Sequence, residues 1–172
     1  MKFFVFVCAM FSLLALCHGC QTVQTKEQAS PLRQRDHDKD GNIIPIRKCE
    51  IDLNGDGLKD LIICHNVSLG GTGGFPYWVY LKGENDQFRE VDRILAGAFA
   101  LDEDDGNKLL WGYSHLSAGS GHMWYSYFDR QGRYQRSPSL LIRAGDSGSE
   151  TGNAIYKAIF NPRTLLVFDE IK

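Results

Sequence analysis

The sequence is poor in several residue classes, and each shortage excludes a class of protein. Its 19 basic and 21 acidic residues leave a formal net charge of -2, so no basic excess is present to bind nucleic acid or an anionic membrane surface. Long runs of strong helix formers are scarce, whereas 18 glycines and 12% aromatic residues are present. This balance favours β-strands joined by turns. The length of 172 residues suits one globular domain plus a targeting segment.

Only one long apolar run is present, and it lies at the N-terminus. Lys2 precedes an apolar stretch at residues 3–16, which is too short to cross a bilayer comfortably and has the layout of a secretory signal. We therefore expect a signal peptide at residues 1–19. The sequence LCHGC at residues 16–20 resembles a bacterial lipoprotein signal, which implies lipidation of Cys20 and a place at the bacterial cell envelope, as a periplasm-facing or surface lipoprotein. Ordinary cleavage without lipidation is the alternative.

Cysteine is also scarce, and its count bears on the signal. Removal of the signal leaves Cys20, Cys49 and Cys64. If Cys20 carries lipid, the other two cysteines form a pair that an exported protein can oxidise; otherwise one thiol is left over. Cys49 and Cys64 lie almost symmetrically about an acidic loop, as cross-strand neighbours in a hairpin would. We therefore predict a lipidated Cys20 together with a Cys49–Cys64 disulfide.

Two segments follow the signal. Residues 20–35 are polar and lack apolar periodicity, which predicts a flexible tether between the membrane and the domain. Residues 36–172 hold the remaining apolar segments and are expected to form the folded domain. A glycine-rich stretch at residues 70–74 lacks the following helix and the Lys-Ser/Thr pair of a phosphate-binding loop, so it is interpreted as a connection into a strand.

The domain begins with an acidic segment. Asp36, Asp38 and Asp40 alternate along it, as in the front half of an EF-hand loop. Arg47 stands where the closing glutamate belongs, and Pro45 interrupts any following helix. Two interpretations stay open, a second calcium loop and a solvated acidic turn that leads into a strand.

The most informative stretch is the acidic loop at residues 52–60, DLNGDGLKD. Its two glycines allow the backbone to turn sharply, and apolar residues flank it on both sides, which predicts a strand, a loop and a second strand. Hard dications such as Ca²⁺ prefer a cage of oxygen ligands. The alternative is a plain hairpin turn, since Asn-Gly and Asp-Gly favour turns without any metal. The residues that offer side-chain oxygens are Asp52, Asn54, Asp56 and Asp60.

This loop, together with VYLKGENDQF at residues 79–88, resembles the calcium-binding repeat of the FG-GAP/VCBS family. The resemblance implies that Ca²⁺ binds through the loop's first, third, fifth and ninth side chains and the carbonyl of its seventh residue. In this sequence those ligands are Asp52, Asn54, Asp56, Asp60 and the carbonyl of Leu58. Members of the family usually join several repeats into a β-propeller, with one blade for each repeat.

A second, degenerate unit follows the first. Residues 69–81 align without gaps with residues 116–128, each a glycine-rich segment followed by an aromatic strand. The acidic residues at 102–106 lack the alternate spacing of the first loop and predict a plain turn. Two units are too few to close a propeller, which needs about four blades. We therefore expect a mainly β fold of two blade-like antiparallel units, propeller-blade or sandwich-like, with a short helix at 149–160 and a last strand at 164–171.

Motifs for catalysis are weak. The sequence GDSG at residues 145–148 contains Ser147, and His65 and Asp102 precede it in the chain order of a serine protease triad. A triad is recognised by geometry and not by order, so this match alone does not assign a hydrolase. We predict no catalytic residue. The other histidines, which show no metal-ligand spacing, are His37, His115 and His122.

Aromatic residues offer the remaining signal for binding. An exposed row of them would suit a glycan or a protein, although alternation along strands sends some into the core. They are Trp78, Tyr80, Trp111, Trp124, Tyr125 and Tyr127. The combined features favour an exported, lipid-anchored, non-enzymatic calcium-binding domain whose partner is an unknown protein or glycan. An inhibitor or immunity-like protein for a cognate enzyme and a serine hydrolase are the alternatives.

Overall fold

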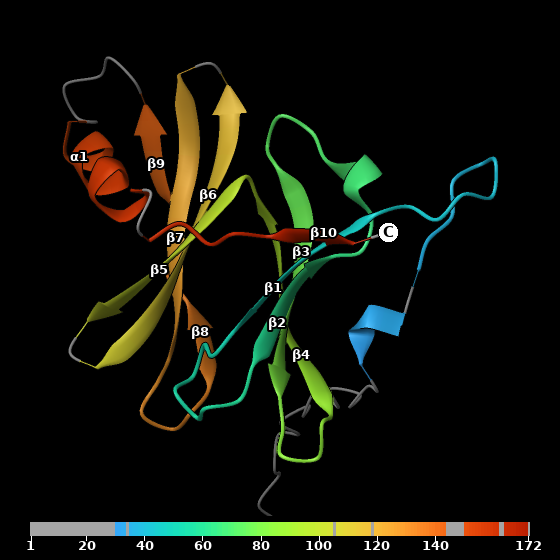
Figure 1. Ribbon diagram of the computed structural model, residues 1–172. Coiled ribbons are helices and arrows are strands. Elements are labelled where there is room, and N and C mark those ends of the chain that lie inside the picture. Colours follow the sequence, from blue (N-terminus) through green and yellow to red (C-terminus); the bar gives the residue numbers. More distant parts are fainter. Residues whose placement is uncertain are drawn as a thin grey trace, which may run out of the picture.

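The computed structural model describes residues 30–33, 35–104, 106–117, 119–143, 150–161 and 164–171. Two antiparallel β-sheets face each other, and one short helix lies against the second sheet (Figure 1). The predicted mainly β fold of two blade-like units with a C-terminal helix is confirmed. The predicted signal peptide, Cys20 and Ser147 lie outside the described residues.

The first sheet is a four-stranded meander in chain order, and the last strand of the chain is added at its β1 edge. Successive side chains of a strand point to opposite faces of the sheet. The strands of this sheet carry apolar residues on both faces, and both faces are covered by other parts of the protein. In the order of the sheet, its strands are β10 (Asp169–Ile171), β1 (Ile46–Ile51), β2 (Asp60–Cys64), β3 (Phe75–Lys82) and β4 (Phe88–Ala96).

The second sheet repeats the meander. Its third strand, β7, carries the second of the two aligned segments, as β3 carries the first. Two short strands share the outer edge of β7, one beside each half of it. The strands are β5 (Ala98–Asp104), β6 (Asn107–Ser117), β7 (Ser120–Phe128), β8 (Tyr134–Arg136) and β9 (Leu140–Arg143).

A single-residue corner joins the two sheets. Gly97 separates β4 from β5, and its N–H donates to the carbonyl of Tyr113 at 2.7 Å. Gly74 packs directly against this corner with a positive φ of 112°, and a Cβ there would lie 2.1 Å from the carbonyl carbon of Ala96. Only glycine fits this backbone approach, so the glycine-rich segment before β3 has a packing role.

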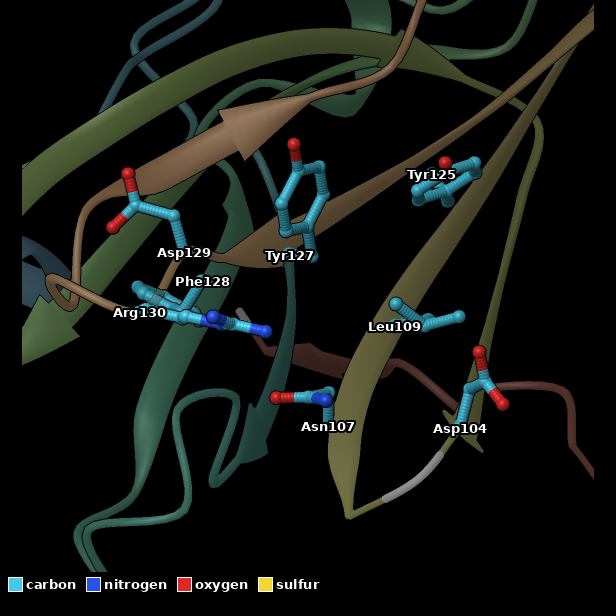
Figure 2. A pocket seen from close by; sticks show the side chains of 8 residues that line it. All are labelled: Asp104, Asn107, Leu109, Tyr125, Tyr127, Phe128, Asp129 and Arg130. Atoms are coloured by element: carbon cyan, nitrogen blue, oxygen red, sulfur yellow. The ribbon is translucent and has the colours of Figure 1, made fainter.

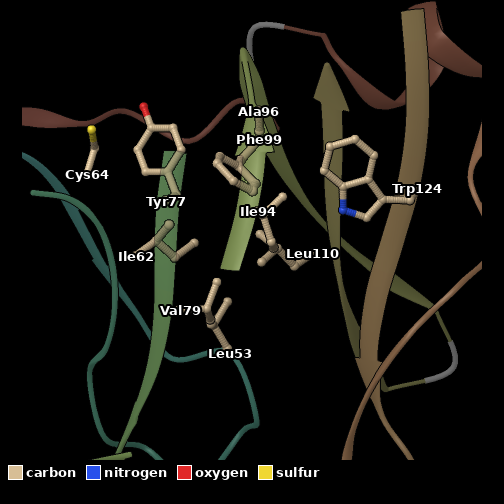
Figure 3. Packing of buried hydrophobic residues seen from close by; sticks show 10 residues of the cluster. All are labelled: Leu53, Ile62, Cys64, Tyr77, Val79, Ile94, Ala96, Phe99, Leu110 and Trp124. Carbon is tan, nitrogen blue, oxygen red and sulfur yellow. The ribbon is translucent and has the colours of Figure 1, made fainter. Parts of the chain in front are cut away.

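The main core lies between the two sheets (Figure 3). Ile62 and Val79 from the first sheet and Phe99 and Leu110 from the second are almost completely buried in it. Smaller clusters cover the outer faces. On the second sheet, helix α1 (Glu150–Ile159) and the following Phe160 pack over Met123 and its neighbours.

The C-terminal segment connects both sheets. Leu165 forms a bridge with Ala100 at the edge of β5, and the chain then continues into β10, which pairs with β1 (Figure 1). Phe168 lies between these two contacts. Its ring centroid is 4.9 Å from that of Tyr77 and 5.8 Å from that of Phe99. The last strand predicted at 164–171 is therefore divided between two sheets, and only its end is a regular strand.

Other boundaries also differ from expectation. The acidic segment predicted as a turn supplies Asp102–Asp104 to the end of β5, and the turn itself lies at Gly106, which has a φ of 76°. The folded part begins before residue 36, because the short 3-10 helix Pro31–Arg33 lies at the end of the predicted tether and places Leu32 against Ile46 and its neighbours. The sequence signal for this contact was the presence of apolar residues such as Leu32 in an otherwise polar segment.

Candidate functional site

The acidic loop connects β1 to β2 and folds by its own hydrogen bonds. Gly55 and Gly57 adopt positive φ values of 81° and 84°, which turn the chain back on itself. Their N–H groups donate to the carboxylate of Asp52 at 2.6 and 3.2 Å. Asp56 accepts from the side-chain amide of Asn54 and from the N–H of Leu58, both at 2.8 Å. The predicted ligand residues are therefore held in one compact loop.

Asp60 closes the loop as the first residue of β2, and its side chain is fully buried. Its two oxygens accept from the N–H groups of Leu53 at 2.8 Å and Lys82 at 2.9 Å. Burial raises the pKa of Asp60 to about 6, and the neighbouring carboxylates of Asp56 and Asp52 add to this rise. A positive charge in the loop would relieve that cost.

One such charge comes from the second sheet. Lys108, on β6, places its Nζ 3.0 Å from Oδ2 of Asp52 and donates to the backbone carbonyl of Asp52 at 2.9 Å. Burial opposes ionisation of Asp52, but this ammonium and the N–H groups of Gly55 and Gly57 hold the pKa of Asp52 below its ordinary value. The loop is therefore linked to the second sheet by an ion pair that the sequence did not indicate.

The donor set of the loop fits a hard dication. All predicted ligands are oxygens, and the buried Asp60 is a carboxylate whose charge is poorly stabilised. Within the described residues, no group of three or more His, Cys, Asp or Glu side chains is arranged to hold a metal ion. The carboxylates engage backbone N–H groups and Lys108 instead, so calcium binding would require Asp52 and Asp56 to exchange those partners for the ion.

The first acidic segment forms a turn. Asp38 accepts from the N–H groups of Asp40 and Asn42 and from the side-chain amide of Asn42, at 2.8–3.0 Å. Asp36 points elsewhere and accepts from the side-chain amide of Asn66 at 3.1 Å. The segment therefore forms a hydrogen-bonded turn in this structure, and a second calcium loop at Asp36, Asp38 and Asp40 stays a prediction.

Cys49 and Cys64 are free thiols in this structure. The register of β1 and β2 pairs Cys49 with Ile62 and Cys64 with Arg47, so the two cysteines are diagonal neighbours on one face and not directly opposed. The near-symmetric positions of the two cysteines about the loop predicted a hairpin centred one residue closer to the C-terminus than the observed one. Burial raises the pKa of both thiols, that of Cys49 to about 11, which keeps them protonated at neutral pH. The disulfide stays a prediction.

A polar pocket of about 290 Å³ lies on the outer face of the first sheet. His65 borders it and is buried, with Nε2 3.4 Å from the hydroxyl of Tyr80, while no described residue bonds to its Nδ1. Burial holds the pKa of His65 below its ordinary value, against the effect of the Asp36 and Glu90 carboxylates. Asp102, which follows His65 in the triad-like chain order that did not assign a hydrolase, lies on β5 in the other sheet.

A larger pocket, of about 410 Å³, lies on the second sheet (Figure 2). Tyr125 and Tyr127 line it, as the aromatic pattern anticipated, whereas Trp124 and Tyr80 are buried in the core. Trp78 and Trp111 are half-buried against the outer clusters. Sequence reasoning did not find the polar side chains at the rim of this pocket, since they come from separate turns. They are Asp104, Asn107, Asp129 and Arg130.

Comparison with known proteins found no family model that matches the chain. No solved structure matches it either. Across the described ranges, no helix has the length and apolar character needed to cross a membrane.

Proposed function

We propose that the protein is an exported, lipid-anchored binding domain of the bacterial cell envelope, stabilised by Ca²⁺ at the loop of residues 52–60. The observation that carries the calcium site is the buried carboxylate of Asp60 beside two further carboxylates in one glycine-turned loop. Three acidic side chains in one short loop favour the binding of a cation, and oxygen ligands of this kind suit Ca²⁺.

The role proposed for the metal is structural. When bound, Ca²⁺ supplies two positive charges to the loop and tightens it. Asp52, Asn54, Asp56 and Asp60 hold the ion together with the carbonyl of Leu58, as in the repeat that the loop resembles. Because Asp60 also accepts from Lys82 at the end of β3, a tightened loop stabilises the first sheet at its turn end. Other surfaces of the domain then bind the partner.

Calorimetric titration of the mature domain with CaCl₂ tests the metal site. We expect one site for the wild type and no measurable heat for Asp56→Ala, whose exposed side chain lies outside the core. Glu84→Ala, at an exposed acid in the turn after β3, serves as the control and is expected to bind normally. The absence of binding in the wild type, or equal binding in Asp56→Ala, would refute the proposal.

Metabolic labelling with a fatty acid in an expressing bacterium tests the anchor separately. We expect label on the wild-type chain and none on Cys20→Ser. An unlabelled wild type would overturn lipidation and leave the calcium proposal intact, because the loop and the N-terminal segment are independent.

A further inference from the structure

The outer face of the second sheet is covered over only part of its area. Tyr113 contacts Tyr156 and Phe160 beside helix α1, with ring centroids 4.8 and 6.0 Å apart. Farther along the same two strands, Trp111, Tyr125 and Tyr127 stay half-exposed. A contiguous exposed aromatic surface of this kind is typical of a binding site.

These rings form one continuous surface. The ring centroids of Trp111 and Tyr125 are 4.9 Å apart and those of Tyr125 and Tyr127 are 5.9 Å apart, with interplanar angles of 52° and 42°. The register places Trp111 directly opposite Tyr125 across the β6–β7 ladder, which fixes the row on rigid backbone. Because the rings are tilted against one another, a ligand would meet each ring separately, and rigid backbone already holds the rings in place.

The pocket beside the row has the size and composition of a small-ligand site. Its volume of about 410 Å³ falls in the usual range of about 300–1,000 Å³. Leu109, Tyr125 and Tyr127 form its floor, and polar side chains stand at its rim (Figure 2). We call this the aromatic pocket. It is lined by Asp104, Asn107, Leu109, Tyr125, Tyr127, Phe128, Asp129 and Arg130.

The charges at the rim favour a neutral ligand with many hydroxyl groups. Asp129 is paired with Arg133, whose Nη2 lies 2.8 Å from Oδ2 of Asp129. The Asp129 carboxylate also accepts from the backbone N–H groups of Gln131 and Arg133. The remaining charges, on Asp104 and Arg130, have opposite signs. An anion would meet Asp104, and an apolar chain would displace water from the exposed charges of Asp104 and Arg130. A sugar ring offers a C–H face for the tyrosines and hydroxyls that both donate and accept.

From this arrangement we infer that the aromatic pocket binds a neutral saccharide. This saccharide is the ligand for the proposed binding role, so the inference rests on that role. It does not depend on the calcium site, since none of the loop residues 52–60 lines the pocket. The sugar ring stacks on Tyr125 and Tyr127, while Asp104, Asn107 and Arg130 bond its hydroxyls. Saccharide binding is therefore measured both in excess EDTA and in excess CaCl₂.

The probes are chitotetraose, cellotetraose, maltotetraose and mannotetraose, titrated into the mature domain with tyrosine and tryptophan fluorescence and calorimetry as readouts. We expect at least one probe to bind, and Tyr127→Ala to weaken it by about tenfold or more. Arg130→Ala, at an exposed side chain that does not threaten folding, is expected to weaken the same probe severalfold. Trp78→Ala, in the other pocket, is the control and retains binding.

Several outcomes overturn the inference. They are failure of all four probes, unchanged binding in both Tyr127→Ala and Arg130→Ala, and loss of binding in Trp78→Ala alone, which would assign the sugar to the polar pocket. Saccharide binding in EDTA, combined with no calcium binding by calorimetry, would remove the metal from the proposed function and leave the pocket assignment standing. Calcium binding without saccharide binding would overturn the pocket assignment and leave the calcium site in the proposed function.

Discussion

At the scale of single residues, two buried ionisable groups have pKa values shifted in opposite directions. Asp60 is fully buried and has a raised pKa, whereas His65 is buried and has a lowered one. Both shifts have burial as their largest cause, because a low-dielectric surrounding disfavours whichever form is charged. The sequence identified Asp60 as a ligand candidate but offered no sign that His65 would be enclosed by aromatic rings.

The lowered pKa of His65 predicts a pH dependence of stability. The unfolded chain takes up a proton at an ordinary histidine pKa near 6.5, whereas the folded protein resists protonation until the pH is lower. The unfolding free energy contributed by His65 is therefore present above about pH 6.5 and decreases as the pH falls below it. We expect His65→Gln to reduce this acid-side slope in denaturant titrations carried out at several pH values.

The matched control for this experiment is His37→Gln, at an exposed histidine in the N-terminal turn. It is expected to leave the slope as in the wild type. An unchanged slope in His65→Gln would show that the buried imidazole is not the titrating group. Comparison of each variant with the wild type in the same buffer separates His65 from the titration of Asp60, which acts in the opposite direction.

At the scale of elements, the acidic loop is part of the contact between the sheets. It lies between β1 and β2, yet the cation nearest to its first carboxylate comes from β6. Lys108 and a bound Ca²⁺ would serve the same carboxylate of Asp52. The loop is therefore expected to fold without metal, and the ammonium is expected to compete with the ion.

This competition predicts the behaviour of Lys108→Met. Loss of the ion pair and of the hydrogen bond to the Asp52 carbonyl is expected to lower the unfolding free energy in EDTA by about 1 kcal/mol. Removal of one positive charge beside the site is expected to raise calcium affinity about tenfold. Denaturant unfolding in EDTA and calorimetric titration measure the two effects, which have opposite directions.

Lys48→Met provides the comparison, since the Lys48 ammonium lies on β1 and pairs with Glu50 at 2.5 Å. It should change calcium affinity little. Weaker calcium binding in Lys108→Met than in the wild type would mean that Lys108 supports the site and does not compete for it.

At the scale of the whole molecule, the C-terminal segment holds the two sheets together. It bridges to β5 through Leu165 and pairs with β1 through β10, and Phe168 enters the main core between them. This long-range connection adds to the shared core and to the Lys108–Asp52 ion pair, which also join the two sheets. Its loss would expose apolar surface on both sheets.

Phe168→Ala tests that role. Removal of a half-buried ring that contacts Tyr77 and Phe99 is expected to lower the unfolding free energy by about 2 kcal/mol, less than for a fully buried phenylalanine. The adjacent Val167 is 81% exposed, so Val167→Ala is expected to change stability by less than about 0.5 kcal/mol. Equal effects of the two substitutions in thermal and denaturant unfolding would contradict a tying role for the segment.

Strong local patterns were sufficient for much of the fold. The aromatic run at residues 75–81 became β3, and the amphipathic stretch after residue 149 became α1. Weak patterns failed. β5 was missed because its end, Asp102–Asp104, is acidic, and β9 was missed because it has only four residues. Such strands form because a neighbouring strand is already in place to pair with them, and no local window carries that information.

The sequence by itself determined the mainly β architecture, the two-unit organisation and the acidic loop, because alternation, glycine positions and turn residues act over short distances. Only the tertiary structure decided which partners those residues meet. It placed Lys108 at the loop, set the β1–β2 register that makes Cys49 and Cys64 diagonal, and brought the residues of the aromatic pocket together from two separate turns. Those features depend on contacts between distant segments, which exist only once the two sheets have packed together.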